Sequence, residues 1–142
     1  MDLIKLSANE ALKMMKEGSL SSEEYVKAFL KQIELRENEV GAWIFLDPKL
    51  ALDQARKADK RWKDKTAGKL NGLPIGIKDI IDTKDMPTEN GSQLCKDRKP
   101  SKDAHLVKLL RNEGAVILGK CVTTEFALSG PGKTKNPKDL EC

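Results

Sequence analysis

The chain has 142 residues, of which 39% are hydrophobic and 34% charged, and its 26 basic and 22 acidic side chains leave a net charge of +4. A chain of this length and hydrophobicity can bury a core, which excludes a disordered acidic or basic tail. The charge is too balanced for a protein that binds mainly by neutralising phosphates. No apolar run approaches the roughly 18 residues of a membrane span, and the start lacks the regions of a signal peptide. These observations predict a cytoplasmic protein with no membrane partner.

The cysteines stand far apart, at Cys95, Cys121 and Cys142, and His105 is the single histidine. Because a structural zinc site needs closely spaced ligands, no metal is predicted. An odd number of cysteines without a secretion signal favours reduced thiols that pack as small hydrophobic side chains. The glycines form neither a phosphate-binding loop nor a dinucleotide fingerprint, so no cofactor is predicted.

Two helices are predicted near the amino terminus. Ser7 and Glu10 form a capping box, and apolar residues follow at helical spacing until Gly18, which ends the helix. Ser21 and Glu24 repeat the capping pattern. The second helix would bury a stripe formed by Val26, Phe29, Leu30 and Ile33.

Residues 40–46 (VGAWIFL) are predicted to form a short strand, after which Asp47 as N-cap and Pro48 as first helical residue begin a helix over 48–65. Basic side chains are frequent over residues 56–69. One interpretation is a helix that faces nucleic acid. The interleaved acidic residues favour the other, a solvated helix face of mixed charge.

The second half of the chain predicts a strand, a helix and another strand. Residues 73–81 (LPIGIKDII) and 115–119 (AVILG) read as buried strands, and residues 102–113 as an amphipathic helix between them. This order is typical of a βαβ unit with parallel strands. The long polar loop over residues 82–100 lies at the carboxyl end of the first strand, where loops are usually functional.

Lys78 is the most informative candidate because it interrupts the first of these strands. Strand alternation places Pro74, Gly76 and Lys78 together on the face that carries little side-chain bulk. One interpretation is a cavity around the amine, in which burial would favour the neutral form that accepts a proton from a hydroxyl nucleophile. The alternative is that Lys78 marks the end of the strand and pairs with Asp79 or Asp82.

The remaining candidates are weaker. His105 has no cysteine or serine nearby that stands out as a nucleophile, and it is interpreted as a surface or packing residue. Ser92 and Ser129 adjoin glycines, but neither lies in a G-x-S-x-G elbow.

Several motifs occur together in a specific order: residues 70–83 (LNGLPIGIKDIIDT), 90–92 (NGS), 103–104 (DA), 110–120 (LRNEGAVILGK), 124–127 (TEFA) and 136–137 (NP). The motifs occur in the order and approximate spacing of the amidase signature family, which the chain resembles over essentially its whole length. The resemblance is strongest over residues 70–137. The predicted opening helices are similar to the family's amino-terminal helical layer.

The resemblance implies a fold, an activity and a site. The fold would be α/β: the amino-terminal part of an α/β/α sandwich with a mixed central sheet. Residues 1–142 would form an incomplete amidase-type domain, with a helical layer over 1–67 and the start of the α/β core over 68–142. The family contains serine amidohydrolases and the A subunits of glutamine-dependent amidotransferases, which cleave carboxamide bonds with a serine nucleophile, a bridging serine beside a cis peptide, and a lysine. By motif match Lys78 is that lysine, and Phe126, Ala127, Leu128 and Ser129 would line the acyl pocket.

The chain departs from the family in one important respect. In the family, the motif seen here as Asn136-Pro137 is soon followed by a Gly/Ser-rich segment that supplies both serines, and residues up to Cys142 do not contain it. Neither Ser92 nor Ser129 takes their place. Without the nucleophile no acyl-enzyme can form, so these 142 residues are predicted to be inactive alone.

Several functions therefore remain open. The leading hypothesis is an amino-terminal fragment of an amidase, or of the A subunit of an amidotransferase. The second is a non-catalytic module completed by a partner chain that supplies the serine loop, and the third is a nucleic-acid module using residues 56–69. The leading hypothesis implies a small-molecule amide as partner of the full-length enzyme, a possible homodimer when complete, and no nucleic acid.

Overall fold

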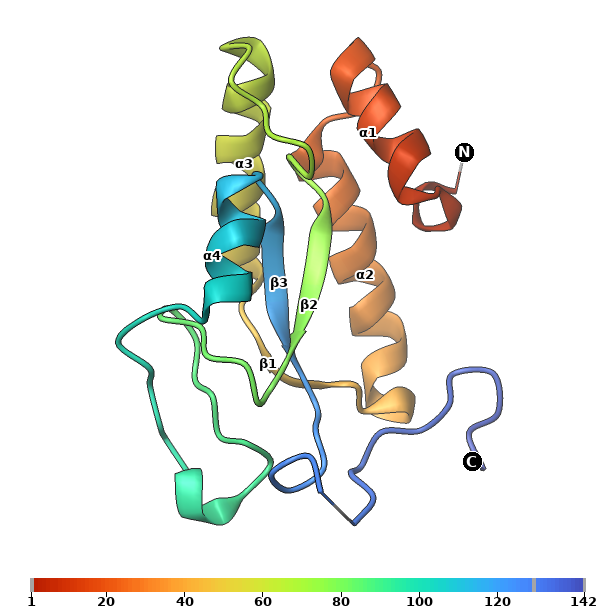
Figure 1. Cartoon of the computed structure of the whole chain (residues 1–142). Coiled ribbons are helices and arrows are strands. Elements are labelled where there is room, and N and C mark those ends of the chain that lie inside the picture. The colour runs from red at the N-terminus through yellow and green to blue at the C-terminus, as the bar shows by residue number, and fades with distance from the viewer. Residues whose placement is uncertain (1, 129, 142) are drawn as a thin grey trace. The chain divides into compact units, whose positions relative to one another are not determined.

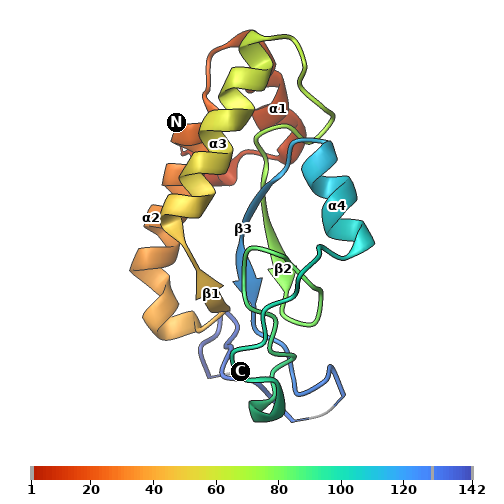
Figure 2. The same cartoon turned by 90° about the vertical axis from the view of Figure 1, so that its left-hand side faces the viewer.

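The computed structural model describes residues 2–128 and 130–141. Over this part of the chain it contains four α-helices, two short 3-10 helices and three strands (Figures 1 and 2). The prediction of a mixed α/β fold is confirmed. In chain order the elements are η1 (Leu3–Lys5), α1 (Ala8–Glu17), α2 (Ser22–Val40), β1 (Trp43–Leu46), α3 (Pro48–Lys63), β2 (Pro74–Lys78), η2 (Gln93–Cys95), α4 (His105–Asn112) and β3 (Val116–Cys121).

The two predicted helix starts are confirmed by their caps. The Glu10 N–H donates to Ser7 Oγ (3.3 Å), and the Ser7 N–H donates to Glu10 Oε2 (2.8 Å). Ser21 and Glu24 make the same reciprocal pair, at 3.1 and 2.9 Å. Each box satisfies backbone donors that the first turn of a helix leaves without partners. Gly18 ends α1 with a positive φ of 75°.

The predicted strand over residues 40–46 is shorter than expected. Val40 is the last residue of α2, and the strand begins only at Trp43. The chain turns at Gly41, whose φ is 62°, and the Trp43 N–H donates to Glu37 Oε1 (2.7 Å). The apolar run alone could not show that its first residue completes a helix.

The helix α3 begins as predicted, with Asp47 as N-cap accepting a hydrogen bond from the Leu50 N–H (3.0 Å) and with Pro48 at its first position. Its basic side chains are partly paired with acids: Arg56 contacts Asp53 (2.9 Å), and Lys60 contacts Asp64 (2.6 Å). These exposed pairs fit a solvated helix face of mixed charge.

The strands form one sheet in the order β1-β3-β2, with β1 antiparallel to β3. The Val116 N–H donates to Leu73 O (2.8 Å), and the Asp79 N–H donates to Cys121 O (2.9 Å), so β2 and β3 advance in the same direction. The sheet is therefore mixed, and the predicted parallel βαβ unit is β2-α4-β3. The helix α4 is shorter than the predicted 102–113, and Gly114 follows it with a φ of 85°.

The chain divides into two compact units. Unit 1 comprises Met1–Ile33, Asp47–Ile75 and Leu109–Leu118, and unit 2 comprises Glu34–Leu46, Gly76–Lys108 and Gly119–Cys142. Within unit 1, residues of α1, α2 and the segments beside them form a small core, which consists of Ala11, Met15, Leu20, Tyr25 and Leu73. Also within unit 1, the Gln54 side chain of α3 binds the backbone of Ile117, because its Oε1 accepts from the Ile117 N–H (3.1 Å) and its Nε2 donates to Ile117 O (3.1 Å).

Unit 2 contains the residues of the candidate site. It includes β1, the carboxyl ends of β2 and β3, and the long loop that follows β2. In the described part of the chain, no helix is both long and apolar enough to cross a membrane.

Candidate active site

Lys78 is the last residue of β2, and its side chain is exposed. Its backbone carbonyl accepts a hydrogen bond from the Ile81 N–H (3.0 Å), which turns the chain away from the sheet. The predicted strand over 73–81 therefore ends at Lys78. Because the Lys78 side chain is exposed, the interpretation in which a cavity encloses its amine is wrong.

The glycine near Lys78 serves packing rather than a cavity around the amine. A Cβ added at Gly76 would lie 2.7 Å from Cys121 Sγ and 2.9 Å from Trp43 Cη2. Side chains from β1 and β3 thus occupy the space that the interpretation of a cavity around the amine requires to be empty. Burial raises the pKa of the Cys121 thiol, which agrees with its predicted role as a small packing residue.

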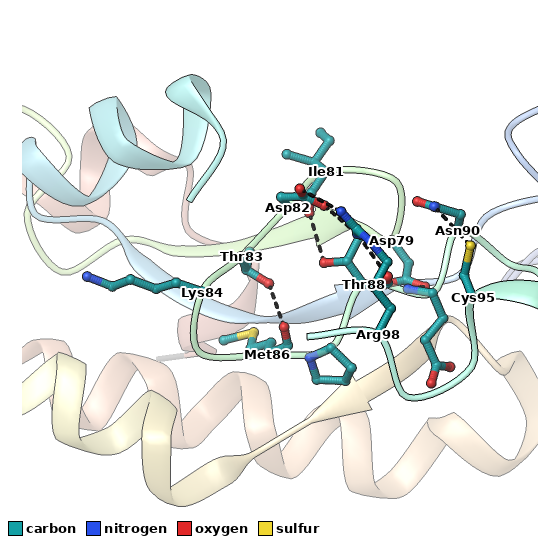
Figure 3. Close-up of polar contacts among 12 residues, drawn as sticks. Asp79, Ile81, Asp82, Thr83, Lys84, Met86, Thr88, Asn90, Cys95 and Arg98 are labelled. Atoms are coloured by element: carbon teal, nitrogen blue, oxygen red, sulfur yellow. Dashed lines mark hydrogen bonds and ion pairs between the residues drawn. The ribbon is translucent and has the colours of Figure 1, made fainter. Parts of the chain in front are cut away.

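The alternative interpretation of Lys78 is confirmed in one part and wrong in the other: Lys78 marks the end of β2, but it pairs with neither Asp79 nor Asp82. The Asp79 carboxylate pairs with Lys120, with 3.0 Å between Lys120 Nζ and Asp79 Oδ1. Asp82 instead forms a bidentate pair with Arg98, at 2.7 and 2.9 Å (Figure 3). The Arg98 guanidinium holds the pKa of the Asp82 carboxyl below its usual value. Both acids after β2 are therefore engaged by other cations.

Lys120 is the buried lysine of this region, and sequence reasoning gave it no role. Its side chain is 0% exposed, and that of Asp79 is 2% exposed. Its Nζ also donates to Pro87 O (3.0 Å) and Thr88 Oγ1 (2.5 Å). Burial lowers the pKa of the Lys120 amine, and the adjacent Asp79 carboxylate opposes that shift. The available signal was a lysine directly after the apolar run AVILG, on a strand that extends beyond its last apolar residue.

The loop after β2 is held by short polar contacts within unit 2 (Figure 3). Thr83 Oγ1 donates to Met86 O (3.4 Å), and the Thr88 N–H donates to Arg98 O (3.0 Å). Arg98 Nη1 returns a hydrogen bond to Thr88 O (3.2 Å). These contacts order a segment whose composition alone would permit a mobile loop.

An open hollow of about 640 Å³ lies beside this loop. Its lining includes Ile81 and the Asp82–Arg98 pair from the loop, together with Phe126. The lining combines an apolar surface with charged groups, a combination suited to an organic molecule that carries a polar group. Lys78 is not among the described residues that line it.

The four predicted wall residues have different positions. Phe126 is 39% exposed and lines the hollow, whereas Leu128 is 83% exposed and does not. Phe126 and Ala127 both have positive φ values, 49° and 57°, and the Phe126 N–H donates to Asn90 O (2.8 Å). Ser129 lies outside the described residues.

The other candidates have structural positions. Ser92 Oγ donates to Glu125 Oε1 (2.6 Å) and accepts from the Leu94 N–H (3.3 Å), so this serine connects the loop to the segment after β3. His105 is exposed at the first position of α4, as predicted for a surface residue. In residues 2–128 and 130–141, no group of three His, Cys, Asp or Glu side chains could hold a metal ion.

Comparisons with known proteins agree with the motifs. The family model described as Amidase matches residues 24–141. The chain is 37% identical to the A subunit of the glutamyl-tRNA(Gln) amidotransferase of Dehalococcoides mccartyi, over 96% of this chain and 29% of the relative. It is 36% identical to the protein of the same name from Clostridium botulinum, over 99% of this chain and 30% of the relative.

Solved structures show the same relationship. The native peptide amidase of Stenotrophomonas maltophilia superimposes with a TM-score of 0.88 at 32% identity, covering 96% of this chain and 31% of the amidase. An amidase family protein of Bacillus anthracis gives a TM-score of 0.85 at 29% identity, covering 96% of this chain and 30% of that protein. The chain thus spans about three tenths of the length of the relatives that it matches. With a family model matched over residues 24–141 and an amidase fold along nearly the whole chain, this protein belongs to the amidase family.

Proposed function

We propose that this chain is the lysine-bearing, amino-terminal part of an enzyme that hydrolyses carboxamide C–N bonds, and that Lys78 is its catalytic base. The observation that carries the proposal is the position of Lys78 within the matched range. It ends a strand of a fold shared with peptide amidase, and its amine is accessible, while the neighbouring acids Asp79 and Asp82 are paired with Lys120 and Arg98.

The proposed mechanism uses a serine nucleophile, a bridging serine and Lys78. The neutral Lys78 amine accepts a proton through the bridging serine as the nucleophile attacks the carboxamide carbon. Collapse of the tetrahedral intermediate breaks the C–N bond, and the proton returns from Lys78 to the leaving amine. Water then hydrolyses the acyl-enzyme. In this proposal both serines lie outside residues 1–142, so the chain alone is inactive.

The acyl part of the substrate is proposed to contact the segment after β3. Phe126 supports this role because it lines the open hollow together with the loop after β2. Ala127, Leu128 and Ser129 complete the proposed wall. Their contribution would depend on how further chain covers the exposed Leu128 side chain.

A second candidate is the A subunit of a glutamine-dependent amidotransferase. The observation that favours it is the 37% identity to a protein described as the A subunit of a glutamyl-tRNA(Gln) amidotransferase. In that case the released ammonia would be transferred rather than lost. A third candidate, a non-catalytic module completed by a serine-bearing partner chain, shares the same lysine strand but needs two chains for activity.

We also propose how the chain is organised, what the full-length enzyme acts on and in which compartment it is found. Residues 1–67 would be a helical layer and residues 68–142 the start of the α/β core. A small-molecule amide would be the substrate of the full-length enzyme, which would be cytoplasmic and could form a homodimer. The free Cys95 and Cys121 support a reducing compartment.

The test has two parts, a gene sequence and an assay. We expect a Gly/Ser-rich segment shortly downstream of codon 142, in the same reading frame. The full-length protein should hydrolyse small amides or glutamine, whereas the chain of residues 1–142 should release no ammonia above background. A stop codon with no gene for a serine-bearing partner, or turnover by the short chain alone, would contradict the proposal. Ammonia release that requires both an acceptor and a second protein chain would favour the amidotransferase.

A further inference from the structure

The buried amine of Lys120 is fully coordinated by groups of unit 2. An ammonium has three N–H donors, and three acceptors surround Nζ: Asp79 Oδ1 at 3.0 Å, Pro87 O at 3.0 Å and Thr88 Oγ1 at 2.5 Å. Because the number of acceptors equals the number of N–H donors, these contacts favour the charged form of the Lys120 amine despite its burial. A buried charge that is completely hydrogen-bonded imposes one geometry on its partners, because any displacement leaves a donor or acceptor unsatisfied.

Asp79, the residue directly after Lys78, is held at every polar group. Its Oδ1 contacts Lys120, and its Oδ2 accepts from the Glu89 N–H (3.1 Å). Its backbone N–H donates to Cys121 O (2.9 Å), and its carbonyl accepts from the Asn90 N–H (3.0 Å). One peptide bond therefore separates the accessible Lys78 from a residue fixed at four points.

From this arrangement we infer that Lys120 is a positioning residue for Lys78. It fixes Asp79 and so the end of β2, and its charge balances the Asp79 carboxylate that adjoins Lys78 in the chain. The inference rests on the proposed function, because it concerns the base of the same reaction. Lys120 itself touches no reacting atom in this account.

Among the acids near the pair, Asp79 is the one whose charge is balanced by Lys120, because Asp82 and Glu89 have other partners. From the loop, Asp82 is engaged by Arg98 in a bidentate pair, and Glu89 Oε1 accepts from the Asp97 N–H (2.7 Å). On β3, Cys121 is a thiol whose pKa is raised by burial and by the nearby Glu37 of α2. Loss of the Lys120 charge would thus leave the carboxylate of Asp79, the residue next to Lys78 in the chain, without its cation.

The experiment compares variants in the full-length enzyme, with circular dichroism and thermal unfolding to establish that each is folded. Lys120→Met removes the charge at similar length. We expect kcat to fall by about 10- to 100-fold, as for a small displacement of a catalytic group, with KM within about twofold. The acidic limb of the pH profile should move to higher pH, because an unpaired carboxylate favours the protonated base. In Lys120→Met/Asp79→Asn the limb should return toward its original position.

Matched controls separate positioning from stability. Lys60→Met breaks the exposed Lys60–Asp64 pair of α3 and should leave kcat and the pH profile unchanged. Thr88→Val removes one acceptor of Lys120 at almost constant volume and should lower kcat severalfold at unchanged KM. It keeps the inference testable if Lys120→Met fails to fold.

The outcomes distinguish this inference from the proposed function. If a folded Lys120→Met or Thr88→Val enzyme shows only a lower unfolding temperature, with kcat and pH profile unchanged, the inference is overturned. If Lys78→Ala retains full activity, the proposed function itself fails. Loss of activity in Lys78→Ala together with a wild-type pH profile and kcat in Lys120→Met would reject the positioning role alone.

Discussion

Lys78 and Asp79 are neighbours in the chain but have opposite surroundings: the amine is exposed, and the carboxylate is buried against Lys120. Strand alternation predicts that consecutive side chains point to opposite faces, and this much could be read from the sequence. The fully buried Lys120 could not, because its partners come from a loop far away in the chain. Nor could the filling of the space at Gly76 by Trp43 and Cys121, which belong to two other strands.

The Asp82–Arg98 pair gives a prediction of pH-dependent stability. The pKa of Asp82 is lowered in the folded chain, chiefly by its hydrogen bonds to Arg98, so the pair stabilises the fold above the unfolded value of about 3.9. This contribution is lost as the pH falls through the folded pKa. Because both side chains are more than a third exposed, we expect Arg98→Met to cost at most about 1 kcal/mol through this charge pair at pH 7.

Urea unfolding of wild type, Arg98→Met and Asp82→Asn at pH 7 and at pH 2.5 checks this expectation. The charge-pair part of the difference should shrink at the acidic pH, leaving the pH-independent loss of the Arg98 hydrogen bond to Thr88 O. A difference between wild type and Arg98→Met that stays constant, or grows, on acidification would show that the pair does not stabilise the fold.

At the scale of elements, helices were easier to predict than strands. The starts of α1, α2 and α3 follow from local signals, a capping box or an N-cap with proline, which act within one turn. Strand ends depend on partners that lie elsewhere in the chain. β2 stops at Lys78 because Ile81 turns back onto its carbonyl, and β3 continues to Cys121, where it pairs with Trp43 of β1.

The packing around β2 predicts that Gly76→Ala destabilises the fold. The new Cβ would lie 2.7 Å from Cys121 Sγ and 2.9 Å from Trp43 Cη2, closer than side chains normally approach. Overpacking of this kind typically costs about 1 to 3 kcal/mol. We expect a lower free energy of unfolding for Gly76→Ala, measured by urea denaturation.

The double variant Gly76→Ala/Cys121→Ala provides the control, because it removes the sulfur that the new methyl group meets. The two substitutions should be less harmful together than the sum of their separate effects. Strict additivity, or a Gly76→Ala protein as stable as wild type, would mean that Gly76 is not closely packed.

At the scale of the whole molecule, the family could be recognised from sequence because its motifs are local strings in a fixed order. The chain also exposes large apolar side chains, notably Leu94 at 87% and Leu128 at 83%, which support the proposal that further chain covers them. The substrate could not be predicted. The hollow beside the loop after β2 is open, and about seven tenths of the length of the known relatives has no counterpart here.

The role of Lys78 as the base of an amide hydrolase is tested most directly by kcat/KM for amide hydrolysis, measured for the full-length protein and two lysine variants. Lys84 is the matched control, since it is also exposed and lies in the loop that follows β2. Lys78→Ala should lower kcat/KM by about 10²- to 10⁴-fold, the usual contribution of a general base, while Lys84→Ala keeps the wild-type value. Equal kcat/KM values for Lys78→Ala and Lys84→Ala would contradict the account.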